Sequence, residues 1–306
     1  MGLISLSAVF FPESAVRKDA DIVIQSLHKA LPSFTQTAAL HIASKRVESR
    51  KVEEMLGIFQ SSSPSYLLMA GIDRCIGLLE RSGRQLFARY EKRLACFYQV
   101  CEKLKYLHVL TEKDYEAYEV PAVDKSKIII HTGCSSINGP SLYQILLDRY
   151  HLQMEMCSAY YVLGMTSIMD TQDGFDRLSQ ALLEIDADME YLAEIENERG
   201  DQSKIQSAIK SDLAQEFLKK AYAEREKVME ISEASHYNNI EEAVLAESVG
   251  KVCAEYIYLY PPGIPMIVPG ERISAGLPEL LGECRKSGMQ IQGMRDKRHE
   301  KILIIR

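Results

Sequence analysis

The sequence has no pair of cysteines at the C-x-x-C spacing, although it contains seven cysteines in 306 residues. Their number is odd and their positions are scattered, at 75, 96, 101, 134, 157, 253 and 284. A secreted disulfide framework usually has an even number of cysteines at regular spacing, so this pattern favours a reducing compartment. Cysteine and histidine also do not cluster at metal-ligand spacing, and zinc is not indicated. We therefore expect a cytoplasmic protein with no bound metal.

Basic charge and long apolar runs are also scarce. The 36 Lys and Arg residues stand against 43 Asp and Glu, for a net charge of −7, whereas a nucleic-acid-binding protein carries a basic stripe. Residues 1–11 are apolar but too short to span a bilayer, and they lack the basic start and cleavage site of a signal peptide. We expect neither nucleic acid nor membrane as a partner. With 46% hydrophobic residues, the chain is able to form two or three domain cores.

The most informative segment lies between Asp21 and His41. A short apolar run at residues 22–24 predicts a buried strand, and Ser26, His28 and Lys29 follow it at once. A lysine that loses hydration at the end of a buried strand can become a nucleophilic amine near neutral pH, as a Schiff base with an aldehyde requires. Because lysines after strands are common, spacing alone leaves an ordinary surface lysine open.

Two further blocks change this interpretation. A serine-rich stretch follows at residues 60–70, and a proline-rich block, Tyr-Pro-Pro-Gly-Ile-Pro, begins at Tyr260. In this order the three blocks resemble the lysine/arginine/ornithine decarboxylases of the aspartate-aminotransferase-like (fold type I) pyridoxal phosphate enzymes. The likeness covers nearly the whole chain from Phe11 onward.

The resemblance implies an α/β fold in three parts. Residues 1–75 would be the C-terminal remnant of a partial fold type I large domain that binds the cofactor. Residues 76–200 would form an α+β small domain with a long linking helix. Residues 201–306 would form the C-terminal α+β domain peculiar to this decarboxylase family.

The resemblance also implies roles for individual residues. Lys29 would form the Schiff base with pyridoxal 5'-phosphate, and Ser26 would hydrogen-bond the cofactor phosphate. His28 would return a proton to Cα after CO2 leaves, or else be a structural histidine at the strand end. The loop at Ser61, Ser62 and Ser63 would reach the phosphate of the neighbouring subunit in a homodimer with shared active sites, or else cap the helix that follows. The substrate would be lysine, arginine or ornithine, and the product an amine of polyamine biosynthesis.

Two acids are candidates for binding a cationic substrate. Glu155 lies on a predicted strand where alternation favours an apolar residue, so it would face either the cleft or solvent. Glu255 stands just before the proline-rich block and is the second candidate.

Three features of the family are not found in the sequence. These are a phosphate-gripping loop, a histidine stacked on the cofactor ring and an Asp-Glu-Ala-His-like motif before the Phe-Pro-Glu-Ser-Ala segment at residues 11–15. Residues 1–7 contain neither an acid nor a histidine. We therefore expect a truncated, C-terminal part of a decarboxylase that is inactive alone. The alternative is a non-catalytic fragment or pseudoenzyme that dimerises with or modulates a full-length decarboxylase.

Periodicity supplies the remaining expectations. The acidic run from Glu184 to Asp201 predicts a solvated helix face or linker. Residues 200–206 are expected to form a linker. Cys134 is expected to be a small buried thiol or a loop filler, with a reactive thiol near a site as the alternative. Strands are predicted at residues 37–42, 128–130, 154–156, 161–165 and 301–306, and helices at 45–59, 66–105, 139–150, 171–195 and 214–231.

Overall fold

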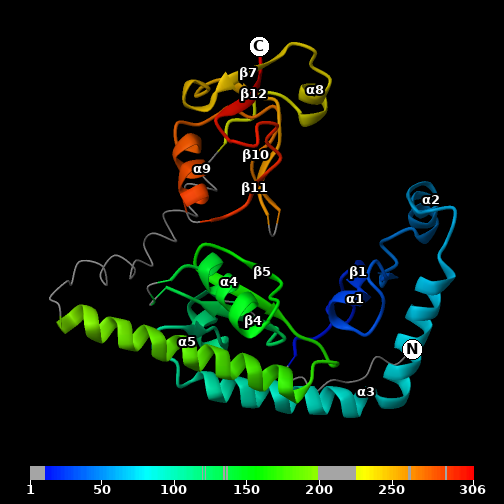
Figure 1. The fold of residues 1–306 in the computed structure, drawn as a ribbon. Coiled ribbons are helices and arrows are strands. Elements are labelled where there is room, and N and C mark those ends of the chain that lie inside the picture. Colours follow the sequence, from blue (N-terminus) through cyan, green and yellow to red (C-terminus); the bar gives the residue numbers. More distant parts are fainter. Residues whose placement is uncertain are drawn as a thin grey trace. The chain divides into compact units, whose positions relative to one another are not determined.

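The computed structural model describes residues 11–118, 120, 122–133, 135, 137–198, 225–260, 263–286 and 288–306. They form a mixed α/β chain, as predicted, and no described helix is long and apolar enough to cross a membrane (Figure 1). The elements are β1 (Ile22–Ser26), α1 (Leu27–Ala30), β2 (Ala38–Ile42), α2 (Ser49–Phe59), α3 (Tyr66–Cys101), β3 (His108–Val109), η1 (Glu112–Tyr118), β4 (Lys127–His131), α4 (Gly139–Tyr150), β5 (Met156–Cys157), β6 (Tyr161–Met165), α5 (Gln172–Glu198), α8 (Ile231–Ser235), β7 (Ile240–Val244), η2 (Leu245–Glu247), β8 (Val252–Cys253), β9 (Ile257–Leu259), β10 (Ile264–Ile267), α9 (Leu277–Lys286), β11 (Ile291–Gln292) and β12 (Lys301–Ile305).

Within the described residues the strands form small sheets. β1 and β2 pair antiparallel in a two-stranded sheet, with Ile24 opposite Leu40. A four-stranded sheet has the order β3-β4-β6-β5. The C-terminal residues form two three-stranded sheets, β7-β12-β8 and β10-β9-β11. β12 is central in the first of these and pairs antiparallel with both neighbours.

The chain divides into two compact units. The first comprises Met1–Leu104, Val109–Ile129 and Gly164–Glu184, and the second comprises Lys105–His108, Ile130–Leu163 and Ile185–Arg306. The boundary predicted at residue 75 falls inside α3, so the three-part division stays a prediction. In the second unit the C-terminal residues have a continuous apolar core that includes Ile257, Ile273, Leu281, Met294 and Ile302.

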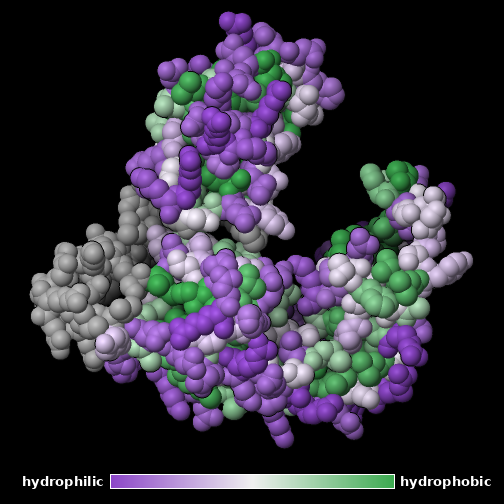
Figure 2. Space-filling view, in the orientation of Figure 1, coloured by the Kyte–Doolittle hydropathy of each residue, from purple (hydrophilic) through white to green (hydrophobic). Residues whose placement is uncertain are grey.

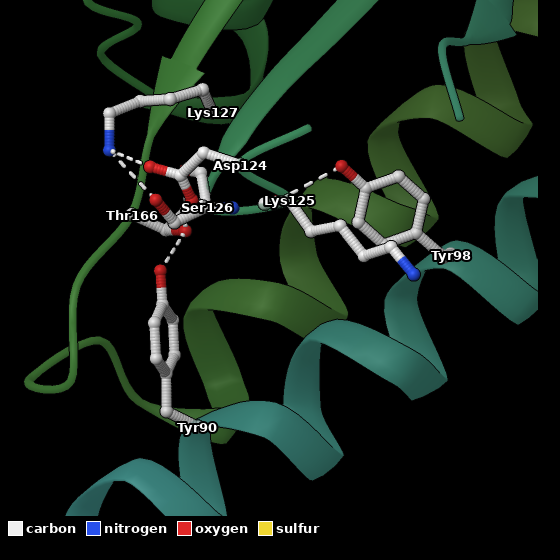
Figure 3. Close-up of polar contacts among 7 residues, drawn as sticks. All are labelled: Tyr90, Tyr98, Asp124, Lys125, Ser126, Lys127 and Thr166. Atoms are coloured by element: carbon white, nitrogen blue, oxygen red, sulfur yellow. Dashed lines mark hydrogen bonds and ion pairs between the residues drawn. The ribbon is translucent and has the colours of Figure 1, made fainter. Parts of the chain in front are cut away.

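The second half of α3 is fixed in the first unit by the buried Tyr90 and the half-buried Tyr98 (Figure 3). The Tyr90 hydroxyl lies 2.6 Å from Thr166 Oγ1, which donates its own proton to the Ser126 carbonyl at 3.0 Å, so Tyr90 is the donor. The Tyr98 hydroxyl donates to the Lys125 carbonyl at 3.1 Å. Burial raises the pKa of both phenols, and both stay neutral donors at physiological pH. These bonds hold α3 against the loop before β4.

Most of the predicted elements are present, with bounds close to those expected. α4 and β6 have the predicted bounds, while α3 and α5 are the two predicted long helices. α2 begins at Ser49 and not at residue 45, because residues 45–47 form a turn in which Ser44 Oγ accepts from the Arg46 amide. Residues 225–230 are not helical, and α8 is short, so the helix predicted to end at 231 is wrong over those residues. Residues 214–224, the linker at 200–206 and Cys134 lie outside the described residues.

The described cysteines differ sharply in exposure. Burial raises the pKa of Cys101, Cys253 and Cys284 to about 12, whereas Cys96 is exposed. Because the thiolate is the reactive form, only about 1 in 10⁴ of a thiol with a pKa near 12 is ionised at pH 8. We expect iodoacetamide at pH 8 to alkylate Cys96 rapidly and the other three only after unfolding, as read by peptide mass spectrometry. Equal modification of Cys96 and Cys253 in the folded chain would contradict this packing.

Candidate functional site

Lys29 lies on a single helical turn that directly follows β1. Ser26, the last residue of β1, has an extended backbone and is the N-cap of α1, but its side chain makes no capping hydrogen bond. Leu27 is buried and anchors the turn, while Ser26 and Lys29 are exposed. Residues three apart lie on the same side of a helical turn. Ser26 therefore begins the turn on which Lys29 lies, and the roles predicted for the two residues stay predictions.

His28 fastens this turn to the start of β2. Its Nδ1 lies 2.9 Å from the Thr37 carbonyl, and because a carbonyl only accepts, Nδ1 is the donor. The same carbonyl accepts from the Leu27 amide at 3.1 Å. This contact matches the structural role that the sequence left open for His28. It also leaves Nε2 of the neutral ring as the proton acceptor, so the role in proton transfer stays a prediction.

The loop between α1 and β2 is organised by Thr37, which sequence reasoning missed. Thr37 is buried, and its Oγ1 lies 2.7 Å from the Phe34 carbonyl and 2.8 Å from Ser33 Oγ. The Phe34 ring lies against Gly71 of α3, where an added Cβ would come within 2.5 Å of ring atom Cδ2. The α1–β2 loop therefore packs against α3 at Gly71, where the Phe34 ring leaves no room for a side chain. A threonine just before an apolar strand is the only sequence signal of this arrangement.

Further polar contacts join the two strands and the turn after them. His41 Nε2 lies 2.9 Å from Gln25 Oε1, across the β1–β2 pair. Arg46 Nε donates to Asp21 at 2.8 Å. The hydrogen bond from Ser44, and then that from Arg46, lower the pKa of Asp21, which is therefore an anion at neutral pH. Asp21 precedes β1, while Lys29 follows it, so these contacts fix the strand pair and do not reach Lys29.

β1 does not form the buried strand that the sequence predicted. Its residues alternate between exposed and half-buried, and Ile24 is 71% exposed. The prediction was wrong because β1 lies in a sheet of only two strands within the described residues, and one side of that sheet is largely exposed.

The serine loop lies between α2 and α3 and is exposed throughout. Ser61 Oγ accepts from the Ser63 amide at 3.1 Å and closes a local turn. Ser65, not one of the three candidate serines, caps α3 by accepting from the Leu68 amide at 3.4 Å. Capping therefore does not occupy Ser61, Ser62 or Ser63, and their predicted contact with a phosphate stays open.

The two candidate acids belong to the second unit, and Lys29 belongs to the first. Glu155 is exposed in a bend just before β5, and not on the predicted strand. Glu255 is buried, and its carboxylate accepts from the amides of Arg295 at 2.8 Å and Leu303 at 2.9 Å. A buried carboxylate that accepts hydrogen bonds from two backbone amides has a structural role, because it satisfies those amides. We therefore carry only Glu155 forward as a candidate for substrate binding.

The residues around Lys29 fit part of a pyridoxal phosphate site. Lys29 is an exposed lysine, whose amine is the group that reacts with an aldehyde, and the hydroxyl of Ser26 is of the kind that suits a phosphate dianion. No group of three His, Cys, Asp or Glu within the described ranges is placed to hold a metal ion. A lysine amine can capture an aldehyde covalently, and this role of Lys29 stays a prediction.

Comparisons with known proteins agree on one family. The family model of the Orn/Lys/Arg decarboxylase major domain matches residues 8–112, and that of the Orn/Lys/Arg decarboxylase C-terminal domain matches residues 211–294. An arginine decarboxylase of Bacillus subtilis (strain 168) is 26% identical over 303 residues, 96% of this chain and 56% of the relative. Protein YaaO of the same strain is 30% identical, with the same shares covered.

Solved structures show the same likeness in fold. The constitutive lysine decarboxylase of E. coli superposes with a TM-score of 0.71 at 18% identity, over 93% of this chain and 49% of that one. Lysine decarboxylase A of Pseudomonas aeruginosa gives a TM-score of 0.68 at 20% identity, with the same shares covered. The chain spans about half the length of the relatives and structures that it matches.

Proposed function

The chain belongs to the Orn/Lys/Arg decarboxylase family, and on that premise we propose that it takes part in pyridoxal-phosphate-dependent decarboxylation of a basic amino acid. The substrate would be lysine, arginine or ornithine, and the products CO2 and the corresponding amine. Residues 1–75 would be the C-terminal remnant of a fold type I large domain. The observation that supports this proposal is the exposed turn after β1, which carries Ser26 and Lys29 within a region matched to the family's major domain.

Each of these residues has a defined task in the proposal. The Lys29 amine would hold the cofactor through its aldehyde, with loss of one water. When bound, the cofactor withdraws electrons from the substrate Cα so that the bond to the carboxylate can break. Ser26 and the serine loop hold the phosphate by donating hydrogen bonds. His28, oriented by its bond to the Thr37 carbonyl, presents Nε2 as the group that carries a proton to Cα.

We also propose a homodimer in which the serine loop reaches the partner's cofactor. Seven large apolar side chains on both sides of this loop are between 40% and 84% exposed: Met55, Leu56, Ile58, Phe59, Tyr66, Leu67 and Met69. Figure 2 shows hydrophobic residues at the surface over α2 and the beginning of α3. If a fully exposed large side chain has an area of about 200 Å², the exposed area of these seven side chains is roughly 900 Å². This is near the ~800 Å² that each partner contributes to a standard interface. These residues therefore support a protein contact beside the serine loop.

The test is a spectroscopic titration of the purified chain. Adding pyridoxal phosphate is expected to produce a new absorbance band near the visible edge, because the Lys29 amine becomes conjugated with the cofactor ring. Lysine, arginine or ornithine should then shift this band by displacing the Lys29 amine, while glutamate should leave it unchanged. A band that responds equally to glutamate would contradict the proposed substrate class.

A second candidate function rests on the exposure of Lys29. A catalytic amine is normally desolvated, and Lys29 is exposed in this chain. The chain would then be a non-catalytic subunit that binds a complete decarboxylase and changes its activity. This reading predicts no absorbance band with pyridoxal phosphate, together with a changed rate when the chain is mixed with a complete enzyme of the family.

A further inference from the structure

The carbonyl of Thr37 holds the turn that carries Lys29. It accepts a hydrogen bond from the Leu27 amide at 3.1 Å and lies 2.9 Å from Nδ1 of His28. The first bond fixes the backbone where α1 begins, and the second fixes the ring of the residue before Lys29. Because a carbonyl only accepts, the second bond places the proton of the neutral ring on Nδ1 and leaves Nε2 as the acceptor. Contacts that hold Thr37 in place therefore act on both the turn and the ring.

Thr37 is itself held by its own loop. It is only 2% exposed, and its Oγ1 donates to the Phe34 carbonyl at 2.7 Å. The Thr37 amide donates to the same carbonyl at 3.1 Å, and Oγ1 lies 2.8 Å from Ser33 Oγ. A buried hydroxyl with such partners keeps one orientation, because breaking its bonds leaves buried polar groups unsatisfied. The position of the Thr37 carbonyl thus depends on the position of Phe34.

The backbone of this loop is strained just before Thr37. Gln36 has a φ of 81°, in the left-handed region that residues other than glycine rarely adopt. Such a conformation persists where surrounding contacts hold it, and it occurs most often at functional sites. Gln36 is exposed, whereas Thr37 is buried, so the hydrogen bonds of Thr37 are the contacts that hold this backbone. They fix a conformation that the loop would otherwise leave.

Phe34 connects the loop to α3. Its carbonyl is the acceptor for Thr37, and its ring lies against Gly71, where an added Cβ would come within 2.5 Å of Cδ2 and 3.1 Å of Cε2. Phe34 and Gly71 both belong to the first compact unit, so this contact is internal to one unit. Because close-packed groups transmit strain, a side chain at residue 71 would displace the ring and the loop with it. A continuous set of contacts therefore runs from Gly71 through Phe34 and Thr37 to His28.

We propose that Gly71, Phe34 and Thr37 are positioning residues for His28. The contact of Phe34 with Gly71 holds the loop, the loop holds the Thr37 carbonyl, and that carbonyl keeps the proton of the neutral His28 ring on Nδ1. Nε2 then remains a proton acceptor on the residue next to Lys29. The inference rests on the proposed function, in which Nε2 carries a proton to Cα, and it names the residues outside the α1 turn that set this state.

The test reads the position of the proton by ¹⁵N NMR of the His28 ring. The full chain without cofactor is labelled with ¹⁵N-histidine and measured at about pH 8.5, where an ordinary imidazole is neutral. The His28 signals are assigned by their loss in His28→Gln, and protonated and unprotonated ring nitrogens are distinguished by their chemical shifts. We expect the proton on Nδ1 in the unmodified chain.

Two substitutions of Thr37 separate its hydroxyl from its shape. Thr37→Val keeps the branched side chain without the hydroxyl, so the loop loses the bonds to the Phe34 carbonyl and to Ser33. We expect the ratio of the Nδ1–H to the Nε2–H tautomer of His28 to fall at least about fivefold. Thr37→Ser keeps the hydroxyl and should preserve the ratio.

Two glycines test the connection to α3 without changing the loop. Gly71→Ala should lower the same tautomer ratio at least about threefold, because its Cβ displaces the Phe34 ring. Gly57→Ala on α2, where an added Cβ meets nothing within 4 Å, should leave the ratio unchanged. Alanine favours a helix over glycine, so loss of helix does not explain an effect of either change. Circular dichroism checks the folding of each variant, and Gly71→Ala is decisive if Thr37→Val does not fold.

Three results would overturn the proposal. The first is a His28 ring with its proton on Nε2 in the unmodified chain. The second is an unchanged tautomer ratio in Gly71→Ala or in a folded Thr37→Val chain, which would mean that the loop only stabilises the fold. The third is an equal change in Gly71→Ala and Gly57→Ala. Because no cofactor enters the measurement, the expected ratios without an absorbance band on addition of pyridoxal phosphate would contradict the proposed function alone.

Discussion

Replacing Lys29 with alanine is expected to abolish the covalent attachment of pyridoxal phosphate to the chain after reduction with borohydride. The Lys29 amine condenses with the aldehyde, and borohydride reduces the resulting carbon–nitrogen double bond to a stable secondary amine. In the unmodified chain, peptide mass spectrometry should place the label on Lys29. In a fully assembled enzyme, loss of a covalent catalytic group of this kind reduces turnover by at least about 10³-fold.

The matched control is Lys45→Ala. Lys45 is exposed in the turn after β2, within the same segment as Lys29, so it reports any unspecific reaction of surface lysines. Its replacement should leave the labelled fraction unchanged. Label spread evenly over Lys29, Lys45 and other lysines would show that the α1 turn has no special affinity for the cofactor.

Local pattern was sufficient to predict the elements that position the candidate site. The apolar run at residues 22–24 predicted β1, and the apolar repeat from residue 66 predicted the long helix α3. Ser65 caps α3, as its place before the apolar repeat indicates. These features depend on residues close together in sequence, which is why a single sequence contains them.

Burial was predicted less well, because it depends on contacts that sequence spacing does not contain. The apolar spacing of residues 47–59 predicted a helix and carried no information on its burial, and α2 has no buried residue. Two acids are instead more buried than the sequence indicated. Glu255 was a candidate for substrate and instead binds two backbone amides, and Asp186 lies in a run predicted to be solvated but is only 5% exposed. In both cases the carboxylate accepts hydrogen bonds from backbone amides at least 40 residues away in the sequence. Such long-range contacts cannot be predicted from the local sequence pattern.

Replacing Asp186 with alanine is expected to destabilise the fold more than any other single carboxylate change considered for this chain. Its carboxylate accepts from the amides of Lys105 and Tyr106 at 2.9 Å and of Leu107 at 2.8 Å, where the chain passes from α3 to β3. Alanine would leave these donors without their acceptor, and the Leu107 amide is buried. A buried amide without a partner costs about 1–3 kcal/mol, so we expect a loss of roughly 3–5 kcal/mol in the free energy of unfolding. Asparagine, which keeps one accepting oxygen, should lose less.

The matched control is Asp188→Ala, two residues after Asp186 on α5. Asp188 pairs with Arg149 at 2.8 Å, but both side chains are more than half exposed, and such surface pairs contribute about 0–1 kcal/mol. Urea unfolding followed by circular dichroism should therefore separate the two variants by several kcal/mol, and thermal unfolding by roughly 10 °C. Equal midpoints for Asp186→Ala and Asp188→Ala would mean that the three amides find other acceptors. The join between α3 and β3 would then be held by its apolar contacts, with Leu107 as the anchor, and not by the carboxylate.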